Sequence, residues 1–461
     1  MKKLVKSLLP ENILKSFTMV REWIPYYYRY GKVFRRTYQE LSEIEHLSSR
    51  QINEYQLIQL KKLVNHCYSN VPYYRKIFDE RNLKPDDINS VQDLKKIPYL
   101  TKEIIRENFD DLISKHIPRK YLKMQTTGGS TGEPLAFYED RRISCAREWA
   151  FVSHIWKRVG FNPRKRQKFV ILRGNKIKKG IMEYNGRDMI LSSYHLTEEN
   201  IKLFLKKIEE FNPDFIQAYP SSIEIMSKHI LINNTNINIP NLKAIICSSE
   251  KIYDNQRIII EKAFKTKIFN LYGHTEHCCI AGNCEKSNLL HFQGEYGFTE
   301  LINEEGFDVS EEDEQGEIIA TNFNNYAMPF LRYRTGDIAI YTKEKCDCNR
   351  HYVNIKDIQG RETEQIITKS GAKVAMTAII FAQHFEAFKK VKRMQLLQEE
   401  VGKVTVKIIE NEKLDYNDQK EIIQKMKDAT NGDLEVFIQV VNDIPLTNRG
   451  KHKFLIQKLD C

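Results

Sequence analysis

Short apolar runs alternate with helical patterns in the middle of this chain, and the alternation restricts the fold more than any other feature. The runs have the length and composition of buried strands, and the segments between them repeat apolar residues at helical spacing. The strand-like runs are Phe169–Leu172, Phe215–Ala218 and Ala244–Cys247, and the helical segments are 198–211, 222–231 and 255–264. A strand, a helix and another strand in succession are typical of parallel sheets covered by helices. The middle of the chain is therefore predicted to be parallel α/β.

The flanking regions have other textures. Residues 45–120 repeat apolar residues at helical spacing, with a break at Val71-Pro72, and are expected to be mostly helical. After residue 290 short β-like runs carry Gly and Asn turns, which indicates a β-rich subdomain; the runs are 299–302, 317–321 and 353–358. The last hundred residues combine strand-like 401–409, helical 417–427 and strand-like 434–441, so they form a small α+β unit.

These textures divide the 461 residues into domains. We expect a large N-terminal domain over 51–359, with parallel sheets and the β-rich subdomain, and a small α+β C-terminal domain over 360–461. The boundary is placed at Gly360-Arg361. Residues 1–50 form a separate basic and aromatic N-terminal arm.

The arm carries much of the positive charge. The whole chain has a formal net charge of +11, and residues 1–40 hold nine Lys and Arg against three Glu, together with Trp23 and several Tyr. Basic and aromatic residues together suit the surface of an anionic membrane. The alternative, which we favour, is a solvated arm packed on the main body. A nucleic-acid partner is not expected, because the charge is concentrated at one terminus without a binding motif.

Targeting signals and disulfide patterns are not recognised. The apolar run after Met1 is too short for a signal peptide, and no run reaches the ~18 apolar residues of a spanning helix. We expect a cytoplasmic protein, with peripheral contact at the inner face of the membrane if the arm binds lipid. Nine cysteines without an export signal indicate reduced thiols or metal ligands.

A loop rich in Gly, Ser and Thr is the first segment that indicates chemistry. It reads Thr126, Thr127, Gly128, Gly129, Ser130, Thr131, Gly132, Glu133 and Pro134. Its unshielded backbone N–H groups and its hydroxyls would form a concave anion site. It is not a Walker A loop, because no Gly-Lys-[Ser/Thr] follows. The alternative is a plain turn, and acidic Glu133 weakens the electrostatic case.

Three later segments add to this loop. Tyr272 and Gly273 follow a strand-like run, and the Tyr272 ring offers a face for a purine, while Glu276 can hold Mg²⁺ against a phosphate. Asp337 follows a Gly turn and can accept the hydroxyls of a ribose. Lys451 comes from a Gly-Lys pair near the C-terminus. Taken singly, each of these is more simply a turn residue or a surface lysine.

The segments in this order resemble the adenylate-forming superfamily of acyl-CoA synthetases, luciferases and peptide-synthetase adenylation domains. Within it, the chain is similar to the branch of phenylacetate–CoA ligases and CapK-like proteins, over about residues 55–461. The matching stretches are Ser69–Arg75, Thr126–Pro134, Tyr219–Ser221, Ser248–Glu250, Tyr272–Glu276, Arg332–Asp337, Gly360–Arg361 and Gly450–Lys451.

The resemblance implies a role for each matching stretch. The Thr126–Gly132 loop would hold the ATP phosphates, and Ser249, Glu250 and Tyr272 would frame the adenine. Thr275 and Glu276 would lie by the α-phosphate and Mg²⁺. Asp337 would hold the ribose with Arg361 nearby, and Lys451 would be the catalytic lysine on a mobile C-terminal domain. The chain departs from the family pattern at Thr363, where an acid is usual, and at Leu135, where many members carry Lys.

The implied activity is ATP-dependent activation of a carboxylic acid. Mg²⁺, the loop donors and a lysine brought in by a closing domain supply positive charge where it is needed as pyrophosphate leaves. The acyl-adenylate would then pass to a thiol, such as that of CoA, or to an amine, and the branch suggests surface-polysaccharide biosynthesis. The alternative is a non-catalytic, nucleotide-binding scaffold at the membrane surface.

A second group of residues indicates a metal. Cys284, His291, Cys346 and Cys348 offer thiolate and imidazole at short spacings in the β-like region, with Cys278 and Cys279 as alternative ligands. Such a set could bind Zn²⁺ tetrahedrally and order the subdomain without taking part in the reaction. The CapK-like branch has similar elements, although Asn349 stands where Gly is usual. The alternative is buried or idle thiols.

Overall fold

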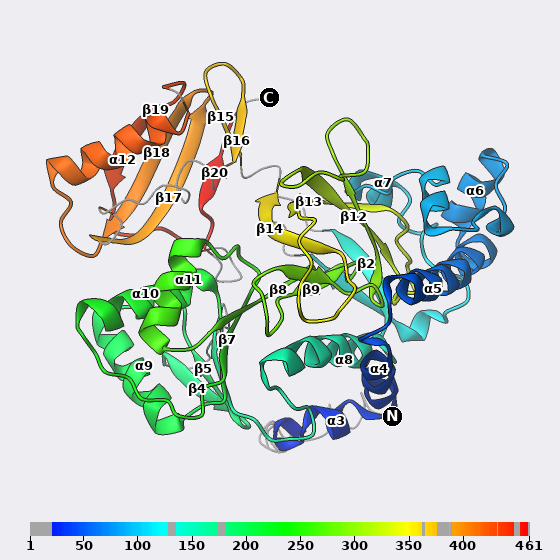
Figure 1. The fold of residues 1–461 in the computed structure, drawn as a ribbon, viewed down its shortest axis with the longest axis horizontal. Helices are drawn as coiled ribbons and strands as arrows, with labels where there is room; N and C mark the ends of the chain where they lie inside the picture. The colour runs from blue at the N-terminus through cyan, green and yellow to red at the C-terminus, as the bar shows by residue number, and fades with distance from the viewer. Residues whose placement is uncertain are drawn as a thin grey trace. The chain divides into compact units, whose positions relative to one another are not determined.

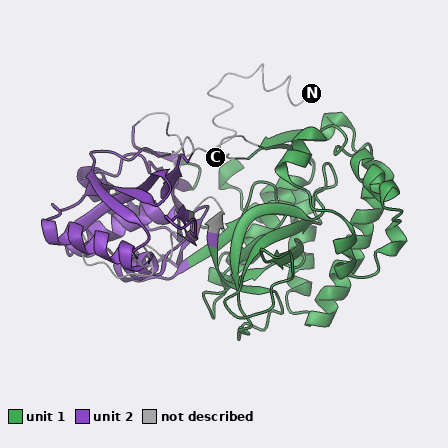
Figure 2. Ribbon diagram, turned by 90° about the horizontal axis from the view of Figure 1, so that it is seen from above, with its two compact units in different colours: residues 1–167, 185–187, 269–358 green, residues 168–184, 188–268, 359–461 purple. Residues whose placement is uncertain are grey.

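The computed structural model describes most of the chain in two compact units. The described residues are 21–127, 135–173, 175, 177, 180–361, 365–375, 387, 390–430, 432–446 and 452–459. The first unit comprises residues 1–167, 185–187 and 269–358, and the second comprises 168–184, 188–268 and 359–461 (Figure 2).

A parallel sheet with helices forms the middle of the second unit. Its strands lie in the order β7-β6-β3-β5-β4, and β6 is parallel to β7 and to β3, which is parallel to β5. The strands are β3 (Phe169–Leu172), β4 (Met182–Asn185), β5 (Asp188–Leu191), β6 (Phe215–Ala218) and β7 (Ala244–Ser248). All but the edge strand β4 are short, apolar and largely buried, as expected for strands covered on both faces. The predicted α/β class is confirmed.

Three helices follow strands of this sheet: α9 (Glu198–Phe211), α10 (Pro220–Ile232) and α11 (Asp254–Phe264) (Figure 1). Local signals set the ends of α9. The Thr197 side chain accepts a hydrogen bond from the Asn200 N–H, and Asn212 ends the helix with a left-handed φ of 47°. The buried faces of all three helices share one apolar core with β3 and β5–β7.

Antiparallel strands form the β-rich part of the first unit, in the order β11-β12-β13-β14-β10-β9-β8. They are β8 (Ile268–Gly273), β9 (Ile280–Gly282), β10 (Leu290–Phe292), β11 (Gly297–Ile302), β12 (Gln315–Asn322), β13 (Tyr333–Tyr341) and β14 (Asn354–Arg361). Gly297 is required at the start of β11, because a Cβ there would lie 2.5 Å from the carbonyl oxygens of Cys278 and Thr321.

Helices and a hairpin complete the first unit. The helices are α3 (Tyr26–Arg29), α4 (Gly31–Ile44), α5 (Ser49–Asn70), α6 (Pro72–Glu80), α7 (Lys102–Glu107) and α8 (Ser144–Trp156). Short 3₁₀ turns are η1 (Pro85–Asp87), η2 (Val91–Lys96), η3 (Arg119–Tyr121) and η4 (Lys157–Val159). Strands β1 (Leu122–Thr126) and β2 (Ala136–Asp140) pair antiparallel and flank the predicted phosphate loop.

The segment expected to be an N-terminal arm is helical where it is described, and it packs on α8. Tyr30 stacks on Trp149 with ring centroids 5.9 Å apart, and Phe34 is fully buried. Glu45, just after α4, is buried and accepts hydrogen bonds from Lys157 and Arg350. Among the described residues, no helix is long and apolar enough to cross a membrane.

The C-terminal part of the second unit is a four-stranded sheet with one helix and its own core (Figure 1). The strand order is β19-β18-β17-β20, and the strands are β17 (Val391–Glu400), β18 (Lys403–Glu410), β19 (Glu435–Val440) and β20 (Leu455–Gln457). Helix α12 (Tyr416–Asp428) begins at Asp415, which caps it. The hairpin β15 (Gln365–Ile367) and β16 (Lys373–Ala375) precedes them. This is the predicted small α+β arrangement.

Candidate active site and candidate metal centre

The phosphate-loop candidate sits on a closed stem. The Thr127 N–H donates to the Leu135 carbonyl, and the Leu135 N–H donates to Thr127 Oγ1, both at 2.9 Å. Thr126 is the last residue of β1 and is exposed. The rest of the predicted loop, Gly128, Gly129, Ser130, Thr131 and Gly132, lies outside the described residues. The stem therefore fixes where the loop begins and ends.

The candidate purine and ribose residues lie together, Tyr272 near the end of β8 and Asp337 in the middle of β13. The Tyr272 hydroxyl donates to Asp337 Oδ2 at 2.8 Å. The Asp337 N–H donates to Thr335 Oγ1 at 3.0 Å, and Gly336 takes a left-handed φ of 75° that suits glycine. Gly273, after Tyr272, is exposed. Two residues separated by 65 positions in the chain are thus held as a pair.

Glu276 is the buried carboxylate of this group, with 7% of its surface exposed. The Tyr333 hydroxyl donates to its Oε1 at 2.8 Å, and His274 Nδ1 lies 3.3 Å from its Oε2. Burial alone would raise the pKa of Glu276, but His274 and the Tyr333 hydroxyl outweigh it and lower this pKa to about 2. The side chain is therefore an anion held in a fixed place, which suits a Mg²⁺ ligand that completes its shell with phosphate and water. Thr275 precedes it and is half-buried.

The second unit groups other predicted residues. Glu250 accepts two backbone hydrogen bonds, from the Ser221 N–H at 3.1 Å and from the His452 N–H at 2.9 Å. The Ser249 hydroxyl accepts a hydrogen bond from the Arg173 guanidinium at 2.9 Å. Lys451, the residue before His452, lies outside the described residues, and so does the Arg361 side chain. Two predicted motifs and the neighbour of the predicted lysine are therefore joined through one carboxylate.

The four predicted metal ligands converge in the first unit. The ligand atoms of Cys284, His291, Cys346 and Cys348 all lie within 4.8 Å of one another. Cys284 follows β9, His291 lies on β10, and the last two precede β14, so a hairpin and a loop distant in the chain supply them. His291 is fully buried. Three thiols and one imidazole whose ligand atoms lie this close together match the donor set of tetrahedral Zn²⁺.

The surroundings of the cluster favour thiolate. The backbone N–H groups of Lys286 and Ser287 each donate to Cys284 Sγ at 3.3 Å. Burial would raise the pKa of Cys284, but these donors and His291 lower it to about 5. Arg350 links the loop next to Cys284 to the end of α4, because its guanidinium donates to Glu285 and to Glu45. The alternative ligand Cys278 is fully buried and belongs to the core.

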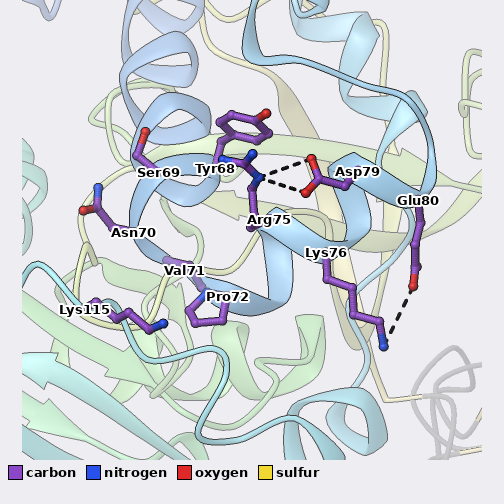
Figure 3. Close-up of a pocket in the computed structure, with 10 residues that line it drawn as sticks. All are labelled: Tyr68, Ser69, Asn70, Val71, Pro72, Arg75, Lys76, Asp79, Glu80 and Lys115. Atoms are coloured by element: carbon purple, nitrogen blue, oxygen red, sulfur yellow. Dashed lines mark hydrogen bonds and ion pairs between the residues drawn. The ribbon is translucent and has the colours of Figure 1, made fainter.

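A hollow of about 530 Å³ lies on the surface where α5 meets α6, lined in part by the Ser69–Arg75 stretch (Figure 3). Arg75 and Lys76 line this hollow and form ion pairs within α6: Arg75 Nε lies 2.9 Å from Asp79, and Lys76 Nζ lies 3.8 Å from Glu80. Nearby, Tyr74 turns into the core and donates to the Pro329 carbonyl at 3.1 Å, while its oxygen accepts from the Leu331 N–H. The stretch therefore braces the chain just before Arg332–Asp337.

Comparisons with known proteins agree with this arrangement. A sequence model of the CapK C-terminal domain matches residues 366–458. Protein CapK of Staphylococcus aureus is 27% identical over 447 residues, covering 93% of this chain and 95% of that protein. The phenylacetate–coenzyme A ligase of Thermus thermophilus is 24% identical, covering 73% of this chain and 76% of that protein. The chain is therefore similar to CapK and to the phenylacetate–coenzyme A ligases.

This kinship confirms the predicted resemblance, and a solved structure agrees on the fold. A 2-hydroxyisobutyryl-CoA ligase, determined in its postadenylation state with an acyl-AMP, superposes with a TM-score of 0.71. It is 14% identical and covers 90% of this chain and 91% of that one, so it shows the fold alone.

Sequence reasoning missed three side chains that contact predicted residues. Tyr333 and His274 hold Glu276, and Glu139 lies beside His277. Tyr333 and His274 are inside segments that were recognised, so their place in the sequence was a signal that went unused. Glu139 is an ordinary strand residue in the sequence, and only its burial in the structure draws attention to it.

Proposed function

We propose that this protein activates a carboxylic acid with ATP and Mg²⁺ as an acyl-adenylate, releasing pyrophosphate. One observation carries the proposal: Tyr272, Glu276, Tyr333 and Asp337 form a single group in which two carboxylates are held in place by two hydroxyls. Glu276 is held as an anion by His274 and the Tyr333 hydroxyl, and a carboxylate fixed in this way suits a Mg²⁺ ligand. The CapK and phenylacetate–coenzyme A ligase relatives support this reading.

The residues would divide the work as follows. The Thr126–Gly132 loop and the metal on Glu276 would hold the phosphates, with Thr275 beside them. Tyr272 would stack on the adenine, which Ser249 and Glu250 would also frame, and Asp337 would bind the ribose with Arg361 close by. Lys451 would place its charge where negative charge develops during transfer.

For the second half-reaction we propose transfer to a thiol, with CoA as the first candidate, and an amine as the alternative acceptor. The phenylacetate–coenzyme A ligases support the thiol, since their names state the acceptor. We also propose a role in surface-polysaccharide biosynthesis, and the exposed Trp23, Ile24 and Tyr28 before α4 would suit work beside an anionic membrane.

The test is acid-dependent exchange of labelled pyrophosphate into ATP across aryl, fatty, hydroxy, amino and uronic acids. The proposal predicts exchange with at least one acid class, and a Lys451→Ala protein that still binds ATP but loses exchange by about a hundredfold or more. Lys453→Ala, two residues away, is the matched control and should keep exchange. Wild-type protein that binds ATP yet exchanges with none of these acids would instead be a nucleotide-binding scaffold.

We also propose that Cys284, His291, Cys346 and Cys348 hold a structural Zn²⁺. The convergence of their ligand atoms within 4.8 Å supports it. Metal analysis of protein purified without added zinc should find about one Zn per chain, and Cys346→Ser should lose it together with several degrees of Tm. Cys145→Ser is the control, because this exposed thiol lies outside the cluster. Equal zinc in wild type and Cys346→Ser would reject the site.

A further inference from the structure

The stem of the phosphate-loop candidate is fastened to the residue that follows Glu276. His277 Nδ1 lies 2.8 Å from Glu139 Oε1 on β2. The Gln125 amide on β1 donates to the other carboxylate oxygen, Oε2, at 2.7 Å. The Glu139 carboxylate on β2 thus joins β1 of the stem to the segment that carries Glu276. Nothing in the roles already proposed for the loop or for Glu276 accounts for this junction.

The backbone conformation of His277 directs its ring toward the β1–β2 stem. His277 has a left-handed φ of 54°, which is unfavourable for a residue with a side chain. The conformation is held from both sides, because the His277 N–H donates to the His274 carbonyl at 3.1 Å and Asn322 donates to the His277 carbonyl at 2.7 Å. Strain that the surroundings maintain in this way is typical of functional sites.

Burial makes the junction specific. Glu139 keeps only 4% of its surface exposed, and the His277 side chain keeps 27%. A buried carboxylate is stable only with charged or donating partners, so removal of either partner leaves the other in an unfavourable place. The neighbouring Asp140 offers a contrast: its partner Arg142 belongs to the same hairpin, and its contact does not leave the stem.

We propose that Glu139 and His277 are positioning residues that hold the β1–β2 stem of the phosphate-loop candidate beside the segment that carries Glu276. The inference rests on the proposed function, in which the loop donors and the metal on Glu276 grip the same triphosphate. Displacement of one anchor by about 1 Å can cost a hundredfold in rate in such a site. Neither residue touches the nucleotide in this account.

The experiment is a double-mutant cycle on the KM for ATP in pyrophosphate exchange. Glu139→Gln and His277→Leu should each raise this KM by about tenfold, and the double variant should also raise it by about tenfold instead of a hundredfold. His277→Gln, whose amide can still donate to Glu139, should recover most of the loss. Asp140→Asn, on the same strand, should leave the KM within about twofold of wild type.

Each outcome decides the matter. Multiplicative effects in the double variant, or an equal effect of Asp140→Asn, would overturn the coupling. If His277→Leu lowers Tm sharply, Glu139→Gln alone tests the junction, and it should still raise the KM for ATP by about tenfold while His277→Gln stays close to wild type. Wild type without any exchange would reject the proposed function, whereas wild-type exchange with unaffected variants would reject this inference alone.

Discussion

Two tyrosines at the candidate active site do the same job for different carboxylates. Tyr272 holds Asp337 and Tyr333 holds Glu276, each through a hydroxyl at 2.8 Å. Phenylalanine would fill both places equally well in the core, so the hydroxyls are explained by the carboxylates. Since one carboxylate is assigned to the ribose and the other to Mg²⁺, the two bonds can be separated by experiment.

Tyr333→Phe should raise the Mg²⁺ concentration for half-maximal exchange by about fivefold, the equivalent of one lost hydrogen bond of about 1 kcal/mol, with little change in KM for ATP at saturating Mg²⁺. Tyr272→Phe is the matched variant and should do the reverse, raising the KM for ATP and leaving the Mg²⁺ requirement unchanged. Titrations of both substrates on the three proteins are the measurement. The same shift in both variants would contradict the assignment.

At this scale the sequence identified residues whose chemistry is local. Tyr272, Glu276 and Asp337 stand beside glycines or strand ends that can be recognised without a structure. Their partners could not be found, because Tyr333 is 57 residues from Glu276 and His277 is 138 residues from Glu139, and no periodicity links them. The same holds for the metal ligands, where spacing suggested two pairs and only folding brings them together.

The elements themselves were predicted best where the pattern was dense. The strands 169–172 and 215–218 and the helix 198–211 have the predicted bounds, because apolar runs and caps agree there. The segment around Val91 was expected to be an α-helix and is the 3₁₀ turn η2, since apolar residues three apart fit both. Val401, placed in a strand, lies in the turn between β17 and β18.

Two glycines in these strands should respond differently to the same change. Gly297→Ala pushes a Cβ against two backbone carbonyls at 2.5 Å, so it should destabilise the protein by about 3 kcal/mol. A Cβ at Gly273 would meet Ile280 at 3.6 Å and the Cys279 carbonyl at 3.9 Å, both ordinary contacts, so the Tm of Gly273→Ala should be unchanged. If ATP approaches the chain after Tyr272, Gly273→Ala should raise the KM for ATP. Thermal unfolding and exchange kinetics of both variants check this.

Glu45 joins α4 to the rest of the first unit. Burial alone would raise the pKa of Glu45, but His154, Arg350 and Lys157 outweigh it and hold this pKa well below its ordinary value. The stabilisation is therefore present above about pH 4.3, the unfolded pKa, and is lost as pH falls below it. Glu45→Ala should cost about 3–5 kcal/mol at pH 7, and less at pH 3.

Thermal unfolding of Glu45→Ala and wild type at both pH values is the measurement. Glu43→Ala, an exposed acid on the same helix, should change Tm by little at either pH. A loss of the same size at pH 3 and pH 7 would mean that the ion pairs contribute nothing.

At the scale of the whole molecule, the order of segments in each unit could not be read from the sequence. The first unit is assembled mainly from residues that come before and after the parallel sheet in the sequence, 1–167 and 269–358. Composition gives no sign of which distant segments pack together. The proposed boundary at residue 360 stays a prediction. What the sequence did establish was the class of each layer, because strand length and helical spacing are local properties.

A buried acid makes the stability of the molecule depend on pH in the opposite sense to Glu45. Glu295 is buried with its carboxyl bonded to the Tyr352 hydroxyl at 2.7 Å, and burial raises its pKa to about 7. Between about pH 4.3 and pH 7 the folded protein binds more protons here than the unfolded chain, so stability falls as pH rises and stays lower above pH 7.

The side chain in Glu295→Gln cannot ionise and keeps an oxygen that accepts the hydrogen bond from Tyr352. The free energy of unfolding of this variant should therefore exceed that of wild type by on the order of 2 kcal/mol at pH 8 and by almost nothing at pH 4. Comparison of the unfolding midpoints at the two pH values is the check. A gain that does not depend on pH would show that Glu295 is ionised in the folded protein.

The contact between Glu45 and Arg350 spans 305 residues, and this has a consequence for how the protein is made. At 5–20 residues per second, a ribosome needs roughly 15–60 s between the two residues. During that interval α4 and α5 have left the ribosome, while the strands that cover them have not been translated. The parallel layer of the second unit, 168–184 and 188–268, emerges in between and has its own core, so it can fold first. The earliest helices are therefore among the last parts to be completed, and they are the surface on which a nascent-chain chaperone would act.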